Sequence, residues 1–476
     1  MEIIGRNSEK ALMKSLLNSP KSEFLAVYGR RRIGKTYLIK NIYAENIAFE
    51  FTGTQNASLN NQLFKFFEKF NAYFPEQIEA EQPKTWSEGF SLLKKCLMKS
   101  PEKKVIFFDE LPWIAGKRSN FLEELAYWWN DWASEQNLVV VVCGSAASWM
   151  LTKVINHKGG LHNRVTKRLN LKPFTLAETK LYLQNLGVNW DNYQITQFYM
   201  AVGGVPTYLN EAQAGETVTQ TLDRIFFGND HFMQTEFHSL YAALFEGYQN
   251  HINIIRALAE KWQGLSRSEI IKSAKLADGG GLSQILSELE ASSFITKLSP
   301  MGKKQKDALY RLSDEYSLFY LKFIEKKSKS AKHEWLKIAQ TDAYKIWCGY
   351  AFENVCIRHV EAIKTALGIS GIYTEISSYW HKGDERETGF QIDLLIDRAD
   401  NAINICEMKF VNDDFRITEP YATQLRRRRE AFRNVSKTKK MLFNTLITTY
   451  GLKNAESLGQ IDHVLTVERL FGLGEF

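Results

Sequence analysis

The chain has 476 residues, which is too long for one small module and, at about 150 residues per domain, predicts about three domains. Its composition, 44% hydrophobic and 13% aromatic, excludes a disordered protein, and a formal net charge of only +7 excludes a wholly electropositive one. The five cysteines are far apart and form no C-x-x-C pair, so neither a disulfide framework nor a zinc cluster is predicted. The longest apolar runs have strand length, and we expect a cytoplasmic protein without a signal peptide or membrane span.

Three regions follow one another along the chain. Up to residue 172, apolar runs such as Phe24–Tyr28 and Leu138–Val142 alternate with helical stretches, which predicts a buried parallel sheet flanked by helices. From 173 the periodicity is mostly helical, and we divide this region into a lid, 173–248, and a winged helix-turn-helix, 249–329. Strands return afterwards, so we expect a second α/β domain over 330–476.

A phosphate-binding loop lies between the strand Phe24–Tyr28 and a helix expected over Thr36–Tyr43. Gly29–Thr36 matches G-x-x-x-x-G-K-[ST], whose glycines let backbone N–H groups surround a phosphate at the positive end of a helix. We expect Lys35 to reach the β- and γ-phosphates of ATP and Thr36 to ligate Mg²⁺. The alternative is a glycine-rich turn. The expected nucleotide contacts of this segment are Gly29, Arg32, Ile33, Gly34, Lys35, Thr36 and Tyr37.

Two acids end the next apolar strand, Val105–Phe108. Asp109 is expected to hold Mg²⁺ through water and Glu110 to polarise the attacking water, which predicts ATP hydrolysis. In a sequence without the phosphate-binding loop, two acids after an apolar strand would indicate only that the strand leaves the hydrophobic core there. Ser145 follows the strand Leu138–Cys143 and is expected either to sense the γ-phosphate or to cap the next helix.

Together with Gly5-Arg6-x-x-Glu9 and Gly203-Gly204-Val205-Pro206, these motifs resemble the prokaryotic and archaeal P-loop ATPases of the STAND and AAA+-like class, over roughly the first half of the chain. The resemblance implies that Arg6 lies near the adenine end of the nucleotide and that Pro206, in the lid, touches the nucleotide or reports its state. It also implies that Arg164 or Arg168 stabilises phosphate charge, in cis or from a neighbouring subunit of a nucleotide-dependent homo-oligomer. The alternative for Gly160–Arg168 is a solvated basic loop.

A helix-turn-helix is predicted from Leu265–Ile271 and Gly279–Glu290, with Ser266 and Glu269 as a capping box. Strands at 294–298 and 308–312 would form a hairpin whose wing, Gly302–Lys306, is basic enough to grip phosphates. The second helix carries acids and no arginine, so contacts of the arginine-to-guanine type are absent. A packing role is therefore favoured over direct DNA binding.

Asp393, Glu407 and Lys409 lie on two predicted strands, Gln391–Ile396 and Ala402–Lys409, in an apolar setting. Glu407 and Lys409 are two residues apart and so project from one face. The group is either a cross-strand ion pair or a Mg²⁺ site in which the lysine positions the attacking water.

With Glu353 on a preceding helix and Gln424 on a following one, D-x(n)-E-x-K resembles the PD-(D/E)xK nucleases, and more specifically the nuclease-like domain fused to these ATPases. The resemblance covers about 343–449 and implies a restriction-endonuclease-like fold in which Glu353, Asp393 and Glu407 ligate metal, Lys409 is catalytic and Gln424 is an accessory polar group. The proline that precedes the aspartate in that superfamily is absent here. Arg426–Arg429 form a solvated helix face by default, or attract phosphates beside the nuclease-like centre.

The sequence thus predicts an α/β multidomain protein: a P-loop parallel-sheet ATPase core, a helical lid plus winged helix, and a C-terminal α/β restriction-endonuclease-like domain. It is expected to bind ATP and Mg²⁺ and to act on nucleic acid, DNA rather than RNA, with no membrane partner. Two alternatives remain. One is a STAND-like switch that uses an inactive nuclease fold to bind partners, and the other is a winged-helix DNA-binding regulator.

Overall fold

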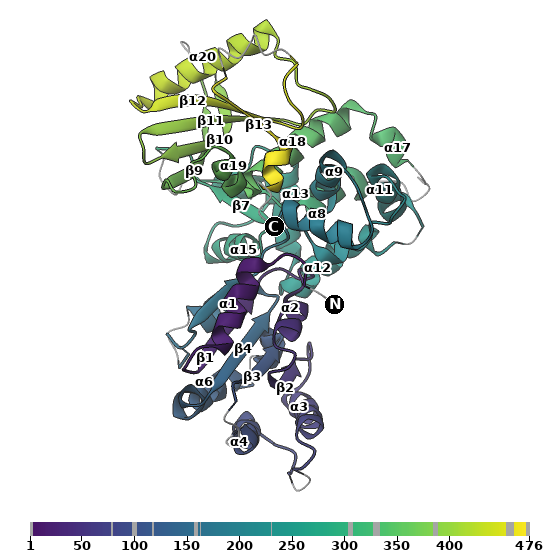
Figure 1. Ribbon diagram of the computed structural model, residues 1–476, viewed down its shortest axis with the longest axis vertical. Helices are drawn as coiled ribbons and strands as arrows, with labels where there is room; N and C mark the ends of the chain where they lie inside the picture. The colour runs from purple at the N-terminus through teal and green to yellow at the C-terminus, as the bar shows by residue number, and fades with distance from the viewer. Residues whose placement is uncertain are drawn as a thin grey trace. The chain divides into compact units, whose positions relative to one another are not determined.

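The computed structural model describes residues 3–77, 80–97, 102–116, 119–156, 160–161, 163–229, 231–302, 308–326, 334–383, 389–453 and 461–472. The chain divides into two compact units, Met1–Lys172 and Pro173–Phe476, which are treated separately below. Figure 1 labels the elements of both.

The first unit is built on a five-stranded parallel sheet with the order β2-β3-β4-β1-β5 (Figure 1). Its central strands β1 and β4 are buried along their whole length, which explains their unbroken apolar sequences. The predicted parallel sheet is therefore confirmed. The strands are β1 Glu23–Tyr28, β2 Ile47–Thr52, β3 Lys104–Asp109, β4 Leu138–Gly144 and β5 Lys167–Asn170.

Helices cover both faces of this sheet. Alternate strand residues such as Leu25 and Val141 pack against Met13 and Leu38 of the first two helices. The residues between them point to the opposite face, where Phe108 contacts Phe121 with ring centroids 5.4 Å apart. The helices are α1 Asn7–Leu17, α2 Lys35–Ile42, α3 Leu59–Tyr73, α4 Trp86–Leu97, α5 Leu111–Ile114, α6 Phe121–Asp131 and α7 Ala147–Met150.

The second unit begins with helices, as the periodicity predicts. Thr175 and Thr217 each start a helix with a capping box, in which the threonine side chain and a residue three positions later satisfy each other's backbone N–H groups. The helices up to residue 244 are α8 Leu176–Asn185, α9 Asn192–Val202, α10 Pro206–Leu209, α11 Val218–Phe227 and α12 Glu236–Leu244.

A helix pair and a small antiparallel sheet follow. The sheet has the order β6-β8-β7, and the predicted capping box of Ser266 and Glu269 is present at the start of α14. The two helices and the two hairpin strands that the sequence predicts are thus confirmed, whereas the basic wing residues Lys303, Lys304 and Lys306 lie outside the described residues. The elements are α13 Gln249–Glu260, β6 Leu265–Ser266, α14 Arg267–Ala274, α15 Gly280–Ala291, β7 Ile295–Leu298, β8 Leu309–Leu312, α16 Glu315–Phe319 and α17 Trp335–Ile338.

The end of the chain forms a second five-stranded sheet, with the order β13-β12-β11-β10-β9. β9, β10 and β11 are antiparallel neighbours, whereas β11, β12 and β13 are parallel, because the long helix α20 carries the chain back between β11 and β12. The elements are α18 Asp342–Arg358, α19 Val360–Ala366, β9 Thr374–His381, β10 Phe390–Arg398, β11 Ala402–Lys409, α20 Glu419–Ser436, β12 Met441–Thr448 and β13 His463–Thr466.

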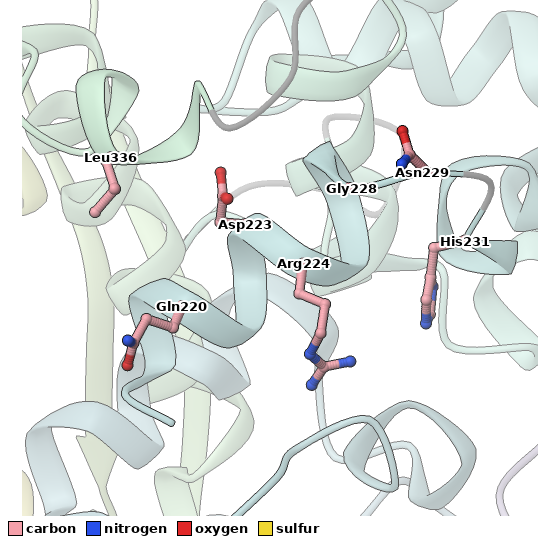
Figure 2. A pocket seen from close by; sticks show the side chains of 7 residues that line it. All are labelled: Gln220, Asp223, Arg224, Gly228, Asn229, His231 and Leu336. Atoms are coloured by element: carbon pink, nitrogen blue, oxygen red, sulfur yellow. The ribbon is translucent and has the colours of Figure 1, made fainter. Parts of the chain in front are cut away.

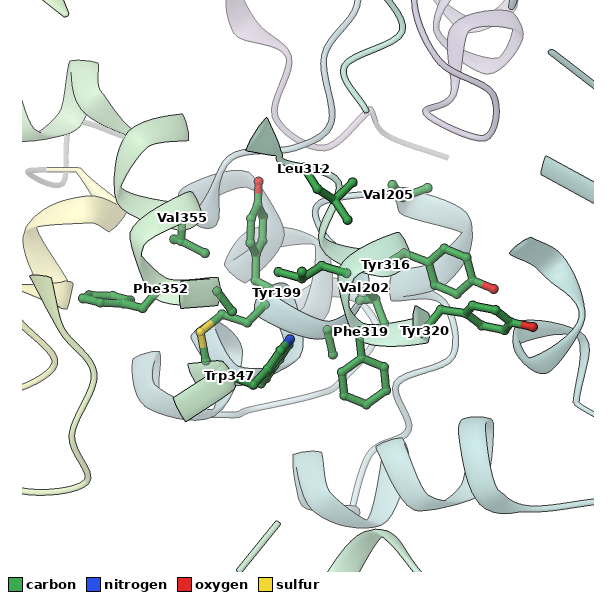
Figure 3. Close-up of a cluster of buried hydrophobic side chains, with 14 of the residues drawn as sticks. Tyr199, Val202, Val205, Leu312, Tyr316, Phe319, Tyr320, Trp347, Phe352 and Val355 are labelled. Atoms are coloured by element: carbon green, nitrogen blue, oxygen red, sulfur yellow. The ribbon is translucent and has the colours of Figure 1, made fainter. Parts of the chain in front are cut away.

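One hydrophobic cluster runs through the second unit from Phe174 to Phe471. Figure 3 shows part of it, where Tyr199 from α9, Phe319 from α16 and Phe352 from α18 gather in one buried group. Helices from the beginning, middle and end of this unit therefore share a core. The finer division into lid, winged helix and nuclease-like domain stays a prediction.

A buried histidine joins two helical segments of this unit. The backbone N–H of Leu176, at the start of α8, donates to His359 Nε2 at 2.9 Å, so Nδ1 carries the proton and donates to the Val355 carbonyl at 2.8 Å. Burial lowers the pKa of His359 to about 4, and the charge of Arg358 acts in the same direction. His359 is thus a neutral link between α8 and the end of α18.

Candidate functional site

The loop between β1 and α2 has the backbone of a phosphate cradle. Gly29 and Gly34 have φ of +145° and +85°, and Arg32 lies in the left-handed region with φ of +69°. A Cβ atom at Gly29 would lie 2.3 Å from the carbonyl oxygen of Leu171, so no larger residue fits there. The close approach of the chain after β5 and the turn itself both require this glycine.

Lys35 is folded into that loop. Its ammonium donates to the carbonyl oxygens of Gly29 at 3.0 Å and Arg30 at 2.8 Å. Burial lowers the pKa of Lys35, although the nearby Cys143, Glu110 and Asp109 act in the opposite direction. The Lys35 ammonium is therefore held inside the loop by backbone carbonyls and lies near the carboxylates of Asp109 and Glu110.

Thr36 and Asp109 meet although they are far apart in sequence. The carboxyl ends of β1 and β3 lie at the same edge of the parallel sheet, and Thr36 Oγ1 donates to Asp109 Oδ2 at 2.8 Å. The other carboxylate oxygen of Asp109 accepts from the backbone N–H of Glu110 at 2.9 Å. A hydroxyl and a carboxylate side by side are oxygen donors that suit Mg²⁺.

Glu110 lies beside this pair with its backbone in the left-handed region, at φ of 47°. Ser145 donates to Glu110 Oε2 from its hydroxyl at 2.9 Å and from its backbone N–H at 3.4 Å. The alternative that Ser145 caps the next helix is wrong, because Ala146 is the N-cap residue of α7 and makes no side-chain cap there. Ser145 instead holds the carboxylate of Glu110.

The other residues predicted to contact the nucleotide do not all lie beside Lys35, Thr36 and Asp109. Ile33 is buried in the core beneath α1 and α2, so it supports the loop, while the side chain of Tyr37 on α2 is 45% exposed. Arg6 is buried before α1, with φ of 57°, and pairs with Glu9 at 3.5 Å. The structure leaves the role of Arg6 near adenine a prediction.

The basic stretch before residue 170 is partly a strand. Residues 167–170 form β5 and pair with β1, which corrects the interpretation of this whole segment as a loop. Arg164, in a turn, and Arg168, on the strand, are both exposed, and His162 lies outside the described residues. Sequence reasoning missed β5 because two exposed basic residues, Lys167 and Arg168, precede its one buried side chain, Leu169.

Pro206 belongs to the second unit, where it is the first residue of α10. The glycines before it are tightly packed: a Cβ at Gly204 would lie 2.0 Å from the carbonyl oxygen of Phe174, and one at Gly203 would lie 2.8 Å from Glu315 Oε2. Glu315 in turn forms an ion pair with Arg358 at 2.7 Å. This segment is therefore fixed against both the start of α8 and the end of α18.

Within the second unit, the three predicted carboxylates come together. Glu353 projects from α18, Asp393 from β10 and Glu407 from β11, and we call these three residues the acidic cluster. Lys409 lies on the same strand face as Glu407, with Nζ 2.8 Å from Glu407 Oε1, as their spacing predicts.

Two arginines and a tyrosine complete the group, and of these the sequence analysis names only Arg428, as one of a run of four arginines. Arg311 on β8 donates to Glu353 Oε2 at 2.8 Å and has its other terminal nitrogen 4.0 Å from Asp393 Oδ1. Arg428 on α20 donates to Glu407 Oε2, and Tyr421 donates to Glu407 Oε1 at 2.9 Å. The cluster is therefore lined by cations from two different parts of the chain.

The pKa values of the three carboxyl groups in the acidic cluster are shifted in different directions. Burial, followed by the neighbouring charge of Asp393, raises the pKa of Glu353 to about 7, and burial also raises the pKa of Asp393. Burial alone would raise the pKa of Glu407 too, but Arg428 and Lys409 outweigh it and lower that pKa to about 2. The neighbouring cations thus favour the ionised form of Glu407, whereas burial favours the neutral form of Glu353.

As they stand, these side chains do not form a metal cage. In the described part of the chain, no group of three or more His, Cys, Asp or Glu side chains is arranged to hold a metal ion. At the acidic cluster, the carboxylate oxygens that would bind a metal ion already have partners. Both oxygens of Glu407 and one oxygen of Glu353 accept hydrogen bonds from cationic or hydroxyl donors.

Gln424 is exposed on α20, and its predicted place beside the cluster is taken by Tyr421 and Arg428. The run of arginines is therefore not a uniformly solvated face. Arg428 is paired with Glu407, Arg429 lies 3.5 Å from Asp462, and Arg426 and Arg427 are exposed. A run of four identical residues gives no signal of which one points inward.

A separate pocket of about 500 Å³ lies beside α11 (Figure 2). Arg224 on its wall is paired with Glu216 at 2.8 Å, and the carboxylate of Asp223 accepts from the backbone N–H of Trp335 at 3.2 Å. These charged groups serve the packing of α11, and nothing in the lining indicates a ligand. None of the helices described in the structure is long and apolar enough to cross a membrane.

Comparison with known proteins shows similarity in the first part of the chain. Residues 4–212 match the model of an ATPase domain found predominantly in Archaea. Uncharacterized protein MJECL04 of Methanocaldococcus jannaschii is 24% identical over 385 residues, which are 80% of this chain and 82% of that protein.

Two solved structures are similar at the level of the chain trace. The Walker-type ATPase PABY2304 of Pyrococcus abyssi is 18% identical, over 67% of this chain and 96% of that one, with a TM-score of 0.49. The Aeropyrum pernix ORC2 protein, solved as ADPNP–ADP complexes, is 15% identical over 67% and 93%, with a TM-score of 0.42. Residues 4–212, which include the loop from Gly29 to Thr36 and the Asp109 carboxylate beside it, are thus similar to an ATPase domain found predominantly in Archaea.

Proposed function

We propose that the first unit binds ATP with Mg²⁺ and hydrolyses it. The observation that carries this proposal is the hydrogen bond of 2.8 Å between Thr36 and Asp109, next to a buried Lys35 in a loop of left-handed glycines. Lys35 and Thr36 begin α2 and Asp109 ends β3, and a purely structural turn would not need them at one edge of the sheet. ATP is the nucleotide that the family match favours.

Each residue then has a distinct task. Lys35 exchanges the loop carbonyls for the β- and γ-phosphates, and Thr36 and Asp109 hold Mg²⁺, directly or through water. Bound Mg²⁺ neutralises charge on the phosphate oxygens. Glu110 orients the attacking water and accepts its proton, and Ser145 fixes the carboxylate of Glu110 until the water arrives.

Changing Glu110 to glutamine tests the hydrolytic step. The variant should bind ATP with nearly wild-type affinity and turn it over about 100-fold more slowly, because the amide orients water without accepting its proton. Calorimetry measures the affinity and phosphate release measures the turnover. Glu45→Gln, which changes an exposed glutamate of the same unit, should have wild-type turnover. Unchanged turnover in Glu110→Gln would remove Glu110 from the reaction.

For the second unit we propose a nuclease-like activity on nucleic acid that the nucleotide state of the first unit controls. Support comes from the placement of Glu353, Asp393, Glu407 and Lys409 around one mixed sheet, in which a helix precedes the antiparallel strands and another joins the parallel ones. Two carboxylates and a lysine can hold a divalent cation and position water against a phosphodiester.

Supercoiled DNA tests this second proposal. Full-length protein with ATP and Mn²⁺ should nick or linearise the DNA, and Asp393→Ala and Lys409→Ala should each abolish cleavage while Lys345→Ala, an exposed lysine on α18, should not. Gel electrophoresis reads the products. Equal cleavage by both site variants and the wild type would mean that another nuclease is present.

The alternative, a nuclease fold kept only to bind partners, is favoured by one observation. Cations of the chain itself already neutralise the acidic cluster, as in a structural ion-pair network. That alternative predicts no cleavage by any variant under any metal or nucleotide condition.

A further inference from the structure

Arg311 comes from outside the elements that carry the acidic cluster. It lies on β8, in the small antiparallel sheet, whereas the carboxylates lie on α18, β10 and β11. We infer that Arg311 is an internal cation that occupies the acidic cluster and keeps a divalent metal out. This inference concerns the regulation of the nuclease-like site and rests on the function proposed for it.

Geometry gives Arg311 the place of a bound cation. Its guanidinium bridges two of the three carboxylates, donating to Glu353 at 2.8 Å and lying 4.0 Å from Asp393. The side chain is only 4% exposed, so water does not share the charge. A divalent ion needs several carboxylate oxygens at once, and those that face Arg311 are already engaged.

The charges balance without any ion. When all three acids are ionised, the acidic cluster carries three negative charges, which match the three positive charges of Arg311, Lys409 and Arg428. Lys409 and Arg428 both act on Glu407, which leaves Arg311 as the cation bound to Glu353. If Arg311 leaves, two buried carboxylates lose their counter-charge, and a divalent cation becomes the group that can replace it.

The end of β8, which carries Arg311, is hydrogen-bonded to one face of α18. Asn354 Nδ2 donates to the Leu312 carbonyl at 3.0 Å, and Arg358 donates to the Ser313 carbonyl at 2.7 Å. One turn earlier, the ring of Tyr350 stacks on Trp262 with centroids 3.7 Å apart. These positions repeat with helical spacing, so α18 presents a single docking face beside Glu353.

Manganese binding to the full chain without nucleotide tests the inference directly. Isothermal titration with Mn²⁺ should show at least tenfold tighter binding at one additional site in Arg311→Gln than in the wild type. Adding Asp393→Asn to that variant should abolish the gain. Arg267→Gln removes an arginine of the neighbouring helix α14 that pairs with Asp278, and it should bind Mn²⁺ like the wild type. Equal Mn²⁺ binding by Arg311→Gln and the wild type would overturn the inference.

Asn354→Ala covers the case in which Arg311→Gln fails to fold. This variant loosens the docking of β8 but leaves every charge of the cluster in place, so it should bind Mn²⁺ more tightly than the wild type and less tightly than Arg311→Gln. Thermal melting followed by circular dichroism identifies the folded variants. A folded Asn354→Ala that binds Mn²⁺ like the wild type overturns the inference when Arg311→Gln is unfolded.

DNA cleavage separates this inference from the proposed function. Gained Mn²⁺ binding without cleavage in Arg311→Gln would support Arg311 as the blocking cation and refute the nuclease. Cleavage by the wild type with ATP, but no gain of Mn²⁺ binding in a folded Arg311→Gln, would support the nuclease and refute the role of Arg311.

Discussion

Replacing Lys35 by alanine is expected to lower the affinity for ATP about 100-fold and turnover about 1,000-fold. The ammonium is buried in the phosphate loop against the carbonyls of Gly29 and Arg30, and it is the cation placed to meet the developing charge on the phosphates. Alanine leaves the loop backbone but removes that charge. Calorimetric titration with ATP and Mg²⁺, followed by phosphate-release kinetics, measures both effects.

Lys40→Ala is the matched control for this experiment. Lys40 lies on the same helix, five positions later, but its side chain is 42% exposed and paired with Glu50. Its replacement should leave ATP affinity and turnover unchanged, because exposed ion pairs contribute little. Wild-type ATP binding by Lys35→Ala would mean that the loop from Gly29 to Thr36 is not the nucleotide site.

The free energy of unfolding is expected to fall by about 3 kcal/mol, through His359 alone, as the pH falls from above 6.5 to about 4. Between these values the unfolded chain binds a proton at His359 that the folded protein does not, because the buried ring accepts from Leu176 and has a lowered pKa. The contribution is complete above the ordinary value of 6.5 and is lost as the pH falls towards 4. Urea denaturation at a series of pH values measures it.

Comparison of His359→Gln with the wild type isolates this contribution. The buried Glu353, whose pKa is raised, acts in the opposite sense, so the slope of the wild type alone does not report one residue. His359→Gln should lose the part of the slope that belongs to His359, whereas His238→Gln, at an exposed histidine, should keep the wild-type curve. Parallel curves for His359→Gln and the wild type would show that the ring is protonated in the folded protein.

The sequence predicts the nucleotide loop well because its chemistry is local. A strand, eight residues of fixed pattern and a helix determine where Lys35 and Thr36 lie, and a buried strand ending in Asp109 must reach the same edge of a parallel sheet. The spacing of Glu407 and Lys409 on one strand works in the same way, since alternate strand residues share a face.

The other features of the two sites depend on contacts between segments that are distant in the sequence, and a single sequence gives no signal for such contacts. Arg311 sits in a short strand where an exposed arginine would be equally ordinary, and only the packing of β8 on α18 brings it to Glu353. The choice of Arg428 over its neighbours depends on the rotation of α20, and β5 depends on pairing with β1. The sequence predicts Ser145 either at the γ-phosphate or as a helix cap, because it does not show that the Glu110 carboxylate lies beside the Ser145 hydroxyl.

The shared hydrophobic core of the second unit determines which fragments of the chain can fold on their own. α18 buries Trp347, Phe352 and Val355 against residues that come from α9 and α16 (Figure 3). A recombinant fragment that starts at α18 would carry this apolar face without its covering helices, and it would aggregate or remain partly unfolded. Fragments for expression should therefore start at Pro173, where the first unit ends, and retain the helices between α8 and α16.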